Sequence, residues 1–264
     1  MSTALITLLT DFGTRDGYVG SCKGVIRQMA PGVEIIDISH DIPPFGIREA
    51  SLTLYNYYDY FPRGAVHLAV VDPGVGSDRG AVILRTAKHT FVGPDNGLFR
   101  LIMENEAHTL YAIDTEKFLK GKRHYTFHGR DMFAPVAARL AMGEAPETLG
   151  RKLPQRTDHG TRPFRKTEDG RVEVPVLSVD HFGNIIFAFN RYDMERLHGL
   201  KIKSIMFKGR SLPGVIHYYG QAEEGGLLAL WNSRDFLELA INGGHAANAL
   251  QVDPREDILI LELE

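Results

Sequence analysis

The chain has 264 residues, with 44% hydrophobic and 24% charged side chains and a formal net charge of -3 at pH 7. This is the composition of an ordinary globular protein, and the length suits two unequal domains or one large one. The chain has no basic stripe, which excludes nucleic acid as the main partner, and no apolar run long enough to span a bilayer. We expect no signal peptide and no membrane partner. The single cysteine, Cys22, excludes an internal disulfide, and a cytoplasmic location is expected.

Strand and helix patterns alternate over the first seventy residues. Apolar runs at 4–9, 33–38 and 66–71 predict strands, while apolar residues at helical spacing over 18–29 and 47–61 predict amphipathic helices. This order implies parallel strands with right-handed crossovers. Two more strands are expected at 81–86 and 89–92, and a helix at 132–142. We therefore predict an α/β N-terminal domain, residues 1–155, with a mainly parallel sheet.

The pattern changes after residue 150. Residues 151–168 are rich in charged residues, Pro, Gly and Thr, which indicates a linker, placed at 156–169. Short β-type runs follow at 172–179, 185–189, 201–207, 226–231 and 258–261, with little helix between them. This spacing predicts a smaller all-β, barrel-like domain over residues 170–264.

Two predicted strands of the N-terminal domain end in a carboxylate. Asp72 closes the strand at 66–71 and precedes a Pro-Gly turn, and Arg79 follows seven residues later. Asp11 closes the first strand, and Asp16 stands just before the first helix, where it is also a candidate N-cap. Ligands of open α/β sheets collect at the carboxyl ends of strands. A candidate active site and a structural salt bridge explain Asp72 and Arg79 equally well.

Two polar turns stand out in the predicted β domain. Asp180 and Asn184 bracket a turn that also contains Phe182, which a plain hairpin does not need. The second turn, Asn232–Ser233–Arg234, precedes Glu238 and Ile241. Either turn alone could be structural, but together they supply the donors, acceptors, charges and aromatic face that a polar small-molecule site requires.

Six short motifs occur in an order that is similar to a known family. They are Thr10–Asp11–Phe12–Gly13–Thr14 with Asp16, Asp72–Pro73–Gly74–Val75–Gly76–Ser77 with Arg79, Gly93–Pro94–Asp95–Asn96–Gly97, His128–Gly129–Arg130–Asp131 with Phe133, Asp180–His181–Phe182–Gly183–Asn184, and Asn232–Ser233–Arg234. The chain resembles the S-adenosyl-L-methionine (SAM) hydrolases that form adenosine, also called SAM hydroxide adenosyltransferases, which are relatives of fluorinases and chlorinases. The resemblance covers essentially the whole chain.

The resemblance implies the reaction, the assembly and the site. It implies hydrolysis of SAM to adenosine and L-methionine without a cofactor or metal, in a homotrimer whose active sites lie between the N-terminal domain of one subunit and the C-terminal domain of its neighbour. The implied catalytic residues are Asp72, Arg79 and His128. The implied substrate-binding residues are Asp11 and Phe45 for the ribose, Asp16, Asp180, Ser233 and Arg234 for the methionine end, Asn184, Phe182 and the stretch around Ile241 for adenine, and Glu238 nearby.

Three other functions stay open at this point. A SAM-dependent halogenase is one, but the halogenating relatives carry Tyr and Thr where this chain has Asp72 and Val75, and Ser where it has Gly129. A non-catalytic sensor of SAM or adenosine is the second. The third is a metal-dependent hydrolase that uses His40, Asp41 and His128.

Overall fold

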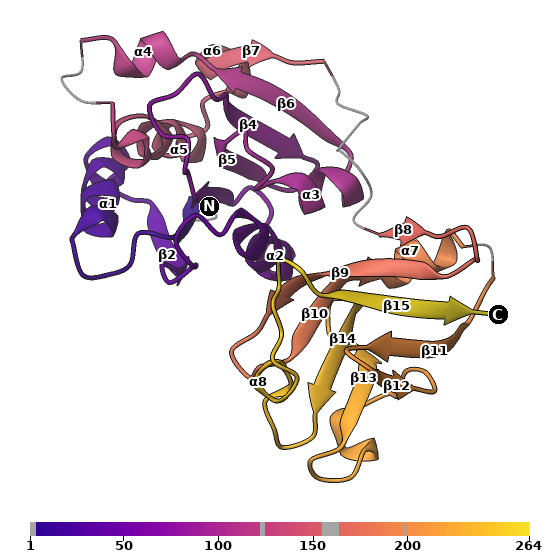
Figure 1. Cartoon of the computed structure of the whole chain (residues 1–264). Helices are drawn as coiled ribbons and strands as arrows, with labels where there is room; N and C mark the ends of the chain where they lie inside the picture. The colour runs from indigo at the N-terminus through magenta and orange to yellow at the C-terminus, as the bar shows by residue number, and fades with distance from the viewer. Residues whose placement is uncertain (1–3, 122–124, 155–163, 198) are drawn as a thin grey trace. The chain divides into compact units, whose positions relative to one another are not determined.

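The computed structural model describes residues 4–121, 125–154, 164–197 and 199–264 (Figure 1). The chain divides into two compact units, Met1–His159 and Gly160–Glu264. Part of the predicted linker, 156–169, lies outside the described residues. Its last part belongs to the second unit, because Phe164 is buried in that unit's core and Arg165–Lys166 form a strand. Within the described residues, no helix is both long and apolar enough to cross a membrane.

The N-terminal unit is a seven-stranded sheet in the order β2-β1-β3-β5-β4-β6-β7. Its strands are β1 (Leu5–Thr10), β2 (Glu34–Ser39), β3 (Val66–Val70), β4 (Ala81–Thr86), β5 (Thr90–Pro94), β6 (His108–Ile113) and β7 (Gly150–Lys152). Its helices are α1 (Tyr18–Met29), α2 (Ile47–Tyr57), α3 (Arg100–Asn105), α4 (Thr115–Leu119), α5 (Ala134–Ala141) and α6 (Pro146–Leu149), with a 3-10 turn η1 (Tyr58–Tyr60) and a π-helical segment η2 (Gly129–Phe133).

The sheet is mixed, which corrects the expectation of a mainly parallel one. Among the described strands, β1–β2, β1–β3 and β3–β5 pair in parallel, while β4–β5, β4–β6 and β6–β7 pair antiparallel. The reason is local, because the short connection from β4 to β5 permits only a hairpin. The parallel strands, which place the site described below, lie together on one side of the sheet.

Helices cover both faces of this sheet (Figure 1). The α1 and α5 helices pack together on one face, and the buried stripe of α1, Val19, Cys22 and Ile26, has the spacing expected of an amphipathic helix. The α2 and α3 helices cover the other face around Leu54 and Phe91. The unit is thus three-layered.

The C-terminal unit is an antiparallel sheet in the order β12-β11-β15-β9-β10-β14-β13, with β8 paired to β9. Its strands are β8 (Arg165–Lys166), β9 (Val172–Val179), β10 (Ile185–Asn190), β11 (Ile202–Phe207), β12 (Arg210–Leu212), β13 (Leu227–Trp231), β14 (Phe236–Ile241) and β15 (Ile258–Leu263). Short helices α7 (Arg191–Glu195) and α8 (Ala246–Ala249) and the 3-10 turn η3 (Tyr219–Gln221) complete it.

This second sheet is curled and nearly closed. An isolated bridge between Ile216 and Leu230 ties the segment after β12 to β13, at the other edge of the sheet. Burial alternates along β9, so its inward side chains meet those of β10 in a core that includes Phe187 and Phe189. The architecture is the barrel-like β domain that the short strand runs predict.

Candidate functional site

The carboxyl ends of β1 and β3 place two carboxylates at one edge of the first sheet. Thr10 pairs with Val70 in the parallel ladder, so Asp11 and Asp72 follow neighbouring strand ends. The chain between Asp72 and Arg79 is folded by tight turns, with the Val75 N–H donating to the Asp72 carbonyl at 3.2 Å and the Ser77 hydroxyl donating to the Gly74 carbonyl at 2.7 Å. These turns bring Arg79 back onto Asp72.

Asp72, Arg79 and His128 form one connected cluster. Arg79 Nε donates to Asp72 Oδ1 at 2.8 Å, and an Arg79 terminal nitrogen donates to Asp72 Oδ2. The same nitrogen lies 2.8 Å from His128 Nδ1. The Asp72 and Arg79 side chains are only 5% and 11% exposed, and the guanidinium lies 5.2 Å from the centre of the Phe133 ring. A two-pronged pair in this setting fixes the planes of both groups.

The contact with Arg79 settles which nitrogen of His128 carries the proton. A guanidinium only donates, so Nδ1 must accept, and the proton of a neutral His128 is on Nε2. Burial, and after it the charge of Arg79, lower the pKa of His128, against the opposing effect of Asp72 and Asp131. The Nε2 atom is buried and has no hydrogen-bond partner among the described residues. His128 therefore presents a donor that a bound oxygen can satisfy.

His128 stands at the entrance of an irregular helical turn. The five residues Gly129–Phe133 are π-helical, a conformation often found at functional sites, and α5 continues from them. A Cβ on Gly129 would lie 3.0 Å from the Phe12 ring and 3.2 Å from the Phe127 ring. The rings of Phe12, Tyr18 and Phe127 pack edge to face beside this turn, with centroids 5.2–6.2 Å apart. Any side chain at position 129 must displace one of them.

Asp11 and Phe45 come together although they are 34 residues apart. The Phe45 backbone N–H donates to Asp11 Oδ2 at 2.9 Å, and Phe45 has a φ of 66°. A bulky residue rarely adopts this left-handed conformation, and such backbone positions cluster at functional sites. The Phe45 ring is 68% exposed. Asp16 is exposed and is not the N-cap of α1, because Gly17, with φ of 74°, takes that position.

In the C-terminal unit, Asp180 organises the turn between β9 and β10. Its Oδ1 accepts the backbone N–H groups of Phe182 at 2.9 Å and Asn184 at 2.8 Å, and its Oδ2 accepts the Asn184 side-chain amide at 3.0 Å. Gly183 has φ of 84° and lies against the His245 ring. The Phe182 ring is left 72% exposed, whereas Asn184 is buried. This turn therefore exposes the Phe182 ring at the surface and holds the buried Asn184 side-chain amide in a fixed orientation.

The structure separates the predicted substrate residues of this unit into two groups. Ile185 pairs with Leu239, so the turn with Asp180 and Asn184 lies at the same end of the β10–β14 ladder as Ile241. Asn190 pairs with Phe236, so Ser233 and Arg234 lie beyond the other end. The three residues from Phe236 to Leu239 span about 10 Å of strand. A ligand that contacts both groups must be elongated.

Glu238 lies between these groups and is buried, with only 3% of its surface exposed. The Tyr219 hydroxyl donates to its Oε1 at 2.8 Å, and the Asn232 side chain also hydrogen-bonds to it. Burial raises the pKa of Glu238, against the effect of these two hydrogen bonds. Asn232 Oδ1 in turn accepts the Arg234 N–H at 3.0 Å. Glu238 is therefore linked through Asn232 to the turn with Ser233 and Arg234.

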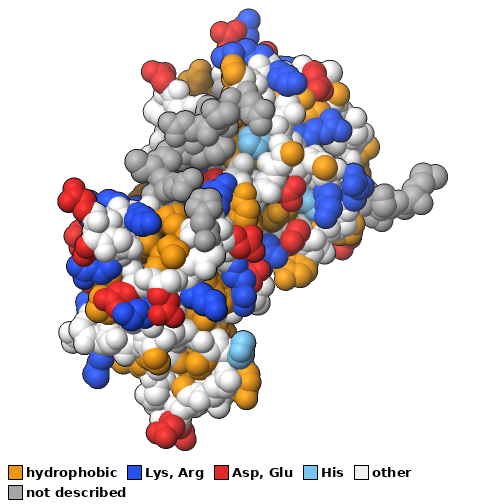
Figure 2. All heavy atoms as spheres, turned by 90° about the vertical axis from the view of Figure 1, so that its right-hand side faces the viewer, with side chains coloured by type: hydrophobic (Ala, Val, Ile, Leu, Met, Phe, Trp, Pro, Cys, Tyr) orange, Lys and Arg blue, Asp and Glu red, His pale blue; other side chains and the backbone are white. Residues whose placement is uncertain are grey.

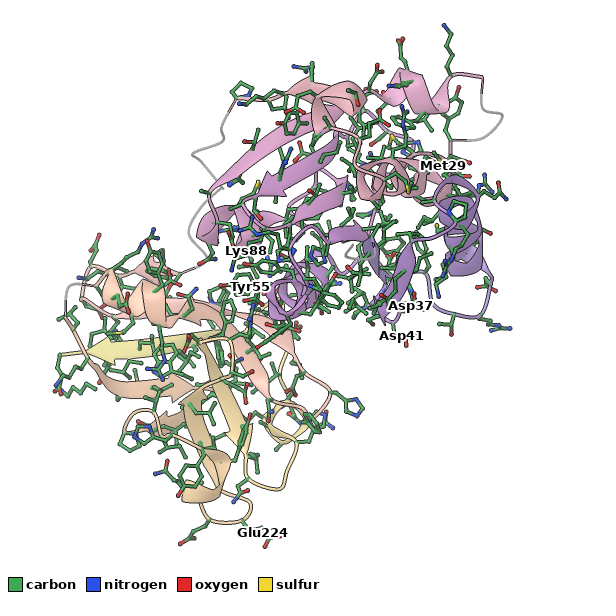
Figure 3. All side chains as sticks on the ribbon, turned by 180° about the vertical axis from the view of Figure 1, so that it is seen from behind. Met29, Asp37, Asp41, Tyr55, Lys88 and Glu224 are labelled. Carbon is green, nitrogen blue, oxygen red and sulfur yellow. The ribbon has the colours of Figure 1, made fainter. Side chains whose placement is uncertain are left out.

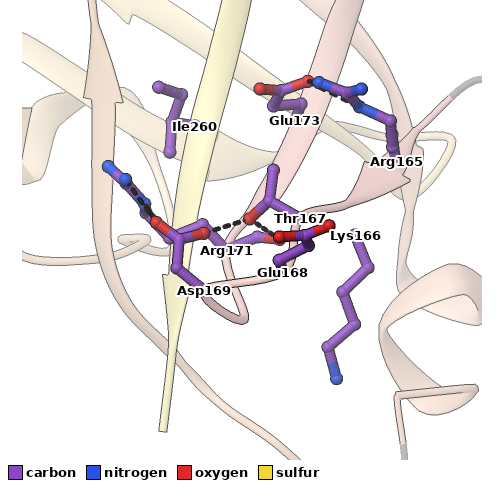
Figure 4. Close-up of a pocket in the computed structure, with 8 residues that line it drawn as sticks. All are labelled: Arg165, Lys166, Thr167, Glu168, Asp169, Arg171, Glu173 and Ile260. Atoms are coloured by element: carbon purple, nitrogen blue, oxygen red, sulfur yellow. Dashed lines mark hydrogen bonds and ion pairs between the residues drawn. The ribbon is translucent and has the colours of Figure 1, made fainter.

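No group of three metal-ligating side chains occurs within the described residues. His40, named in the metal hypothesis, is buried with Nδ1 2.8 Å from Thr10 Oγ1, while Asp41 is exposed. A hollow of about 530 Å³ lies elsewhere, against β8 and β9, and no predicted site residue lines it (Figure 4). Its charged side chains largely pair with one another, as Arg165 does with Glu173 and Arg171 with Asp169. On the face drawn in Figure 2, acidic and basic side chains are interspersed.

Sequence reasoning missed one participant in these sites, Tyr219, and the supporting contacts of two residues that it names for other reasons, Thr10 and His40. Thr10 and His40 hold the turn of Asp11, and Tyr219 holds Glu238. Thr10 directly precedes Asp11 at the end of the first predicted strand, so its position could have indicated a supporting role. His40 follows the end of the second predicted strand. Tyr219 lies 19 residues from Glu238 with no local pattern to connect them.

Two family models match the chain on either side of the 151–173 segment. The SAM hydroxide adenosyltransferase N-terminal domain matches residues 6–150, and the SAM hydroxide adenosyltransferase C-terminal domain matches residues 174–259. The chain belongs to the SAM hydroxide adenosyltransferase family. The resemblance carried by the six motifs is thereby confirmed.

Curated relatives and solved structures align with nearly the whole chain. Proteins named (R)-S-adenosyl-L-methionine hydrolase from Salinispora arenicola and Thermus thermophilus are 37% and 38% identical to it, over 98% and 93% of this chain and 98% and 94% of theirs. A fluorinase from Actinoplanes is 26% identical over 92% of both chains. The crystal structure of an uncharacterized conserved protein from Thermotoga maritima superposes with a TM-score of 0.83 at 35% identity, covering 97% of this chain and 99% of that one.

Proposed function

We propose that this chain hydrolyses SAM at C5′, giving adenosine and L-methionine. The observation that carries the proposal is the buried Asp72–Arg79–His128 cluster at the carboxyl end of β3. The relatives named SAM hydrolases align over nearly the full length and support the same reaction.

The chemistry requires a stronger nucleophile rather than a better leaving group. The sulfonium of SAM leaves as a neutral thioether, but water, with a pKa near 15.7, is a weak nucleophile. In the proposed step, the water oxygen forms a bond to C5′ while the C5′–S bond breaks and its electron pair goes to sulfur. The proton lost from water passes to a carboxylate and then to solvent. General-base assistance of this kind is worth roughly 10²–10⁴-fold in rate.

We assign Asp72 as the proton acceptor and His128 as a hydrogen-bond donor. Arg79 donates to both Asp72 oxygens, but each carboxylate oxygen has a second lone pair for the water. His128 has Nδ1 occupied by Arg79 and its proton on Nε2, so it can orient the attacking oxygen but cannot take its proton. Arg79 holds the other two in fixed geometry, which is the preorganisation that electrostatic catalysis needs.

The assay incubates the chelator-treated protein with a mixture of SAM epimers and measures adenosine and methionine by chromatography. We expect equimolar release of both products and a loss of at least 100-fold in kcat for Asp72→Asn. Asp78→Asn, an exposed carboxylate of the same loop, is the matched control and should keep wild-type turnover. Near-wild-type turnover by Asp72→Ala with intact SAM binding contradicts the assignment. Retained adenosine without methionine release favours a sensor.

The proposed substrate contacts are those that the family resemblance implies. We propose that Asp11 and Phe45 hold the ribose and that Phe182, Asn184 and Ile241 hold adenine. The methionine end is proposed to meet Asp16, Asp180, Ser233 and Arg234, of which Asp180 lies beside Asn184 on the β10–β14 ladder. The separation of the two groups along this ladder suits an elongated substrate with a nucleoside at one end and an amino acid at the other.

We further propose a homotrimer in the cytoplasm, with each site completed by the C-terminal unit of a neighbour. Mixing Asp72→Ala chains with Arg234→Ala chains tests this, after the trimer has been verified by light scattering. If the two sites reside on different chains, about a quarter of the sites in randomly mixed trimers regain both intact residues. If each site is built from one chain, mixing restores no activity.

A further inference from the structure

A buried histidine outside the proposed chemistry contacts the turn that carries Asp11. His40 is 5% exposed and follows β2, the strand parallel to β1. Its Nδ1 lies 2.8 Å from Thr10 Oγ1, and its Nε2 lies 3.1 Å from Asp37 Oδ1, an ion-pair distance without good hydrogen-bond alignment. One ring nitrogen of His40 thus faces the Thr10 hydroxyl, and the other faces the Asp37 carboxylate. Histidine placed this way in a core is held by its neighbours in one orientation.

The partners of His40 extend from the surface to the active-site edge. Asp37 is partly exposed, lies at the end of the unit where Figure 3 also labels Asp41, and is paired with Lys23 Nζ at 2.5 Å. Burial alone would raise the pKa of Asp37, but Lys23, through its hydrogen bond and its charge, and the neighbouring His40 together lower it. Asp37 therefore faces His40 as an anion, which places a proton on Nε2 and leaves Nδ1 to accept from Thr10.

The turn after β1 is attached to His40 at two points. Thr10 Oγ1 accepts the Phe12 N–H at 3.2 Å while its own proton is directed to His40 Nδ1. The Gly13 N–H donates to the His40 carbonyl at 2.8 Å. Asp11 lies between these attachments, and its carboxylate accepts the Phe45 N–H. With backbone fixed on both sides, the Asp11 side chain has little freedom to move.

We propose that His40 is a positioning residue that acts through Thr10 to fix the Asp11 carboxylate for the ribose hydroxyls. The inference rests on the proposed function, which gives Asp11 that role. The ribose hydroxyls do not react, so their contact is made alike in the ground state and the transition state. Loss of such a contact raises KM and leaves kcat nearly unchanged.

The test uses a shape-conserving pair at Thr10. Thr10→Val removes the hydroxyl and keeps the volume, whereas Thr10→Ser keeps the hydroxyl and serves as the matched control. We expect Thr10→Val to raise KM for SAM about 10-fold with kcat within about twofold, and Thr10→Ser to stay within about twofold of wild type. His40→Asn, which retains an acceptor toward Thr10, should be milder than His40→Leu.

A second readout separates positioning from stability. Wild-type protein should bind adenosine more tightly than 2′,3′-dideoxyadenosine, and Thr10→Val and Asp11→Asn should each reduce that preference. In the double variant the two losses should not add, because both remove the same contact. Additive losses, or a lower unfolding midpoint with an unchanged preference, overturn the inference. Absence of SAM hydrolysis in the wild-type protein overturns the proposed function instead, and the inference with it.

Discussion

At the residue scale, chemistry depends on the direction of individual hydrogen bonds. The motif order places Asp72, Arg79 and His128 in one family pattern, but spacing alone leaves a structural salt bridge equally good. The contact of Arg79 with His128 Nδ1, with Nε2 buried and unpartnered among the described residues, is what gives the cluster a donor for a bound oxygen. A structural salt bridge would not require that third member.

The pH dependence of kcat/KM tests the state of His128. Protonation at Nδ1 would place a hydrogen against the Arg79 donor and break the contact. Burial and Arg79 lower the pKa of His128 from its usual 6.5, so the neutral form, which the proposed mechanism requires, persists as the pH falls through that value. We expect kcat/KM to stay level from pH 8 to 6.5 and to decline only below. An acid limb centred at or above pH 6.5 contradicts this. His128→Asn, which cannot titrate, should lack the contribution of His128 to this limb.

At the element scale, regular patterns predict elements well and irregular turns poorly. The helical spacing over 18–29 matches α1, yet the Asp16 cap is wrong because Gly17 turns the chain first. The apolar spacing over 132–142 predicts an ordinary helix, whereas its start, Gly129–Phe133, is π-helical. The periodicity of apolar residues indicates which face of a helix is buried, but it does not indicate that one turn contains an extra residue, as a π-helical turn does.

Two glycine substitutions distinguish the effect of helix propensity on stability from the effect of steric crowding. Gly24 lies on the exposed side of α1 with no atom near its would-be Cβ, so Gly24→Ala should raise the free energy of unfolding by about 0.5–1 kcal/mol. Gly129→Ala adds the same methyl group against Phe12 and Phe127, so it should destabilise the protein by about 1–3 kcal/mol and lower kcat. Urea unfolding of both variants measures this. If both substitutions change the free energy of unfolding equally, the rings of Phe12 and Phe127 move aside at no energetic cost.

At the scale of the whole molecule, a buried histidine pair limits stability in acid. His67 on β3 is fully buried and stacks on Phe91 with centroids 4.9 Å apart, and the His89 ring lies 5.0 Å away. His67 Nδ1 lies 2.8 Å from Thr7 Oγ1. Burial, with a smaller contribution from His89, lowers the pKa of His67 from 6.5 to about 3. Burial also lowers the pKa of His89, where Lys88 and Arg63 act in the same direction and Glu106 and Asp59 oppose them.

The pH dependence of unfolding follows from these values. Between pH 6.5 and 3, His67 is protonated in the unfolded chain and neutral in the folded protein. The free energy of unfolding therefore falls as the pH falls, by about 1.4 kcal/mol per pH unit. Urea midpoints at pH 7.5 and 5 measure the loss. His67→Phe should flatten the dependence whatever its stability at pH 7.5, whereas His217→Gln, an exposed site, should not change it. An unchanged slope in His67→Phe contradicts the role of His67.

The sequence by itself determined the α/β class of the first unit, the barrel-like β unit and, through six ordered motifs, the family, but it did not predict strands β6, β7, β12 and β14. These features follow from local periodicity and from residues close together in the chain. Only the tertiary structure decided the mixed sheet, the split of Ser233 and Arg234 from Asn184 along one ladder, the burial of Glu238, and the hold of His40 on the Asp11 turn. These depend on pairing and packing between distant segments, and a sequence read for period and spacing contains no record of which distant segments meet.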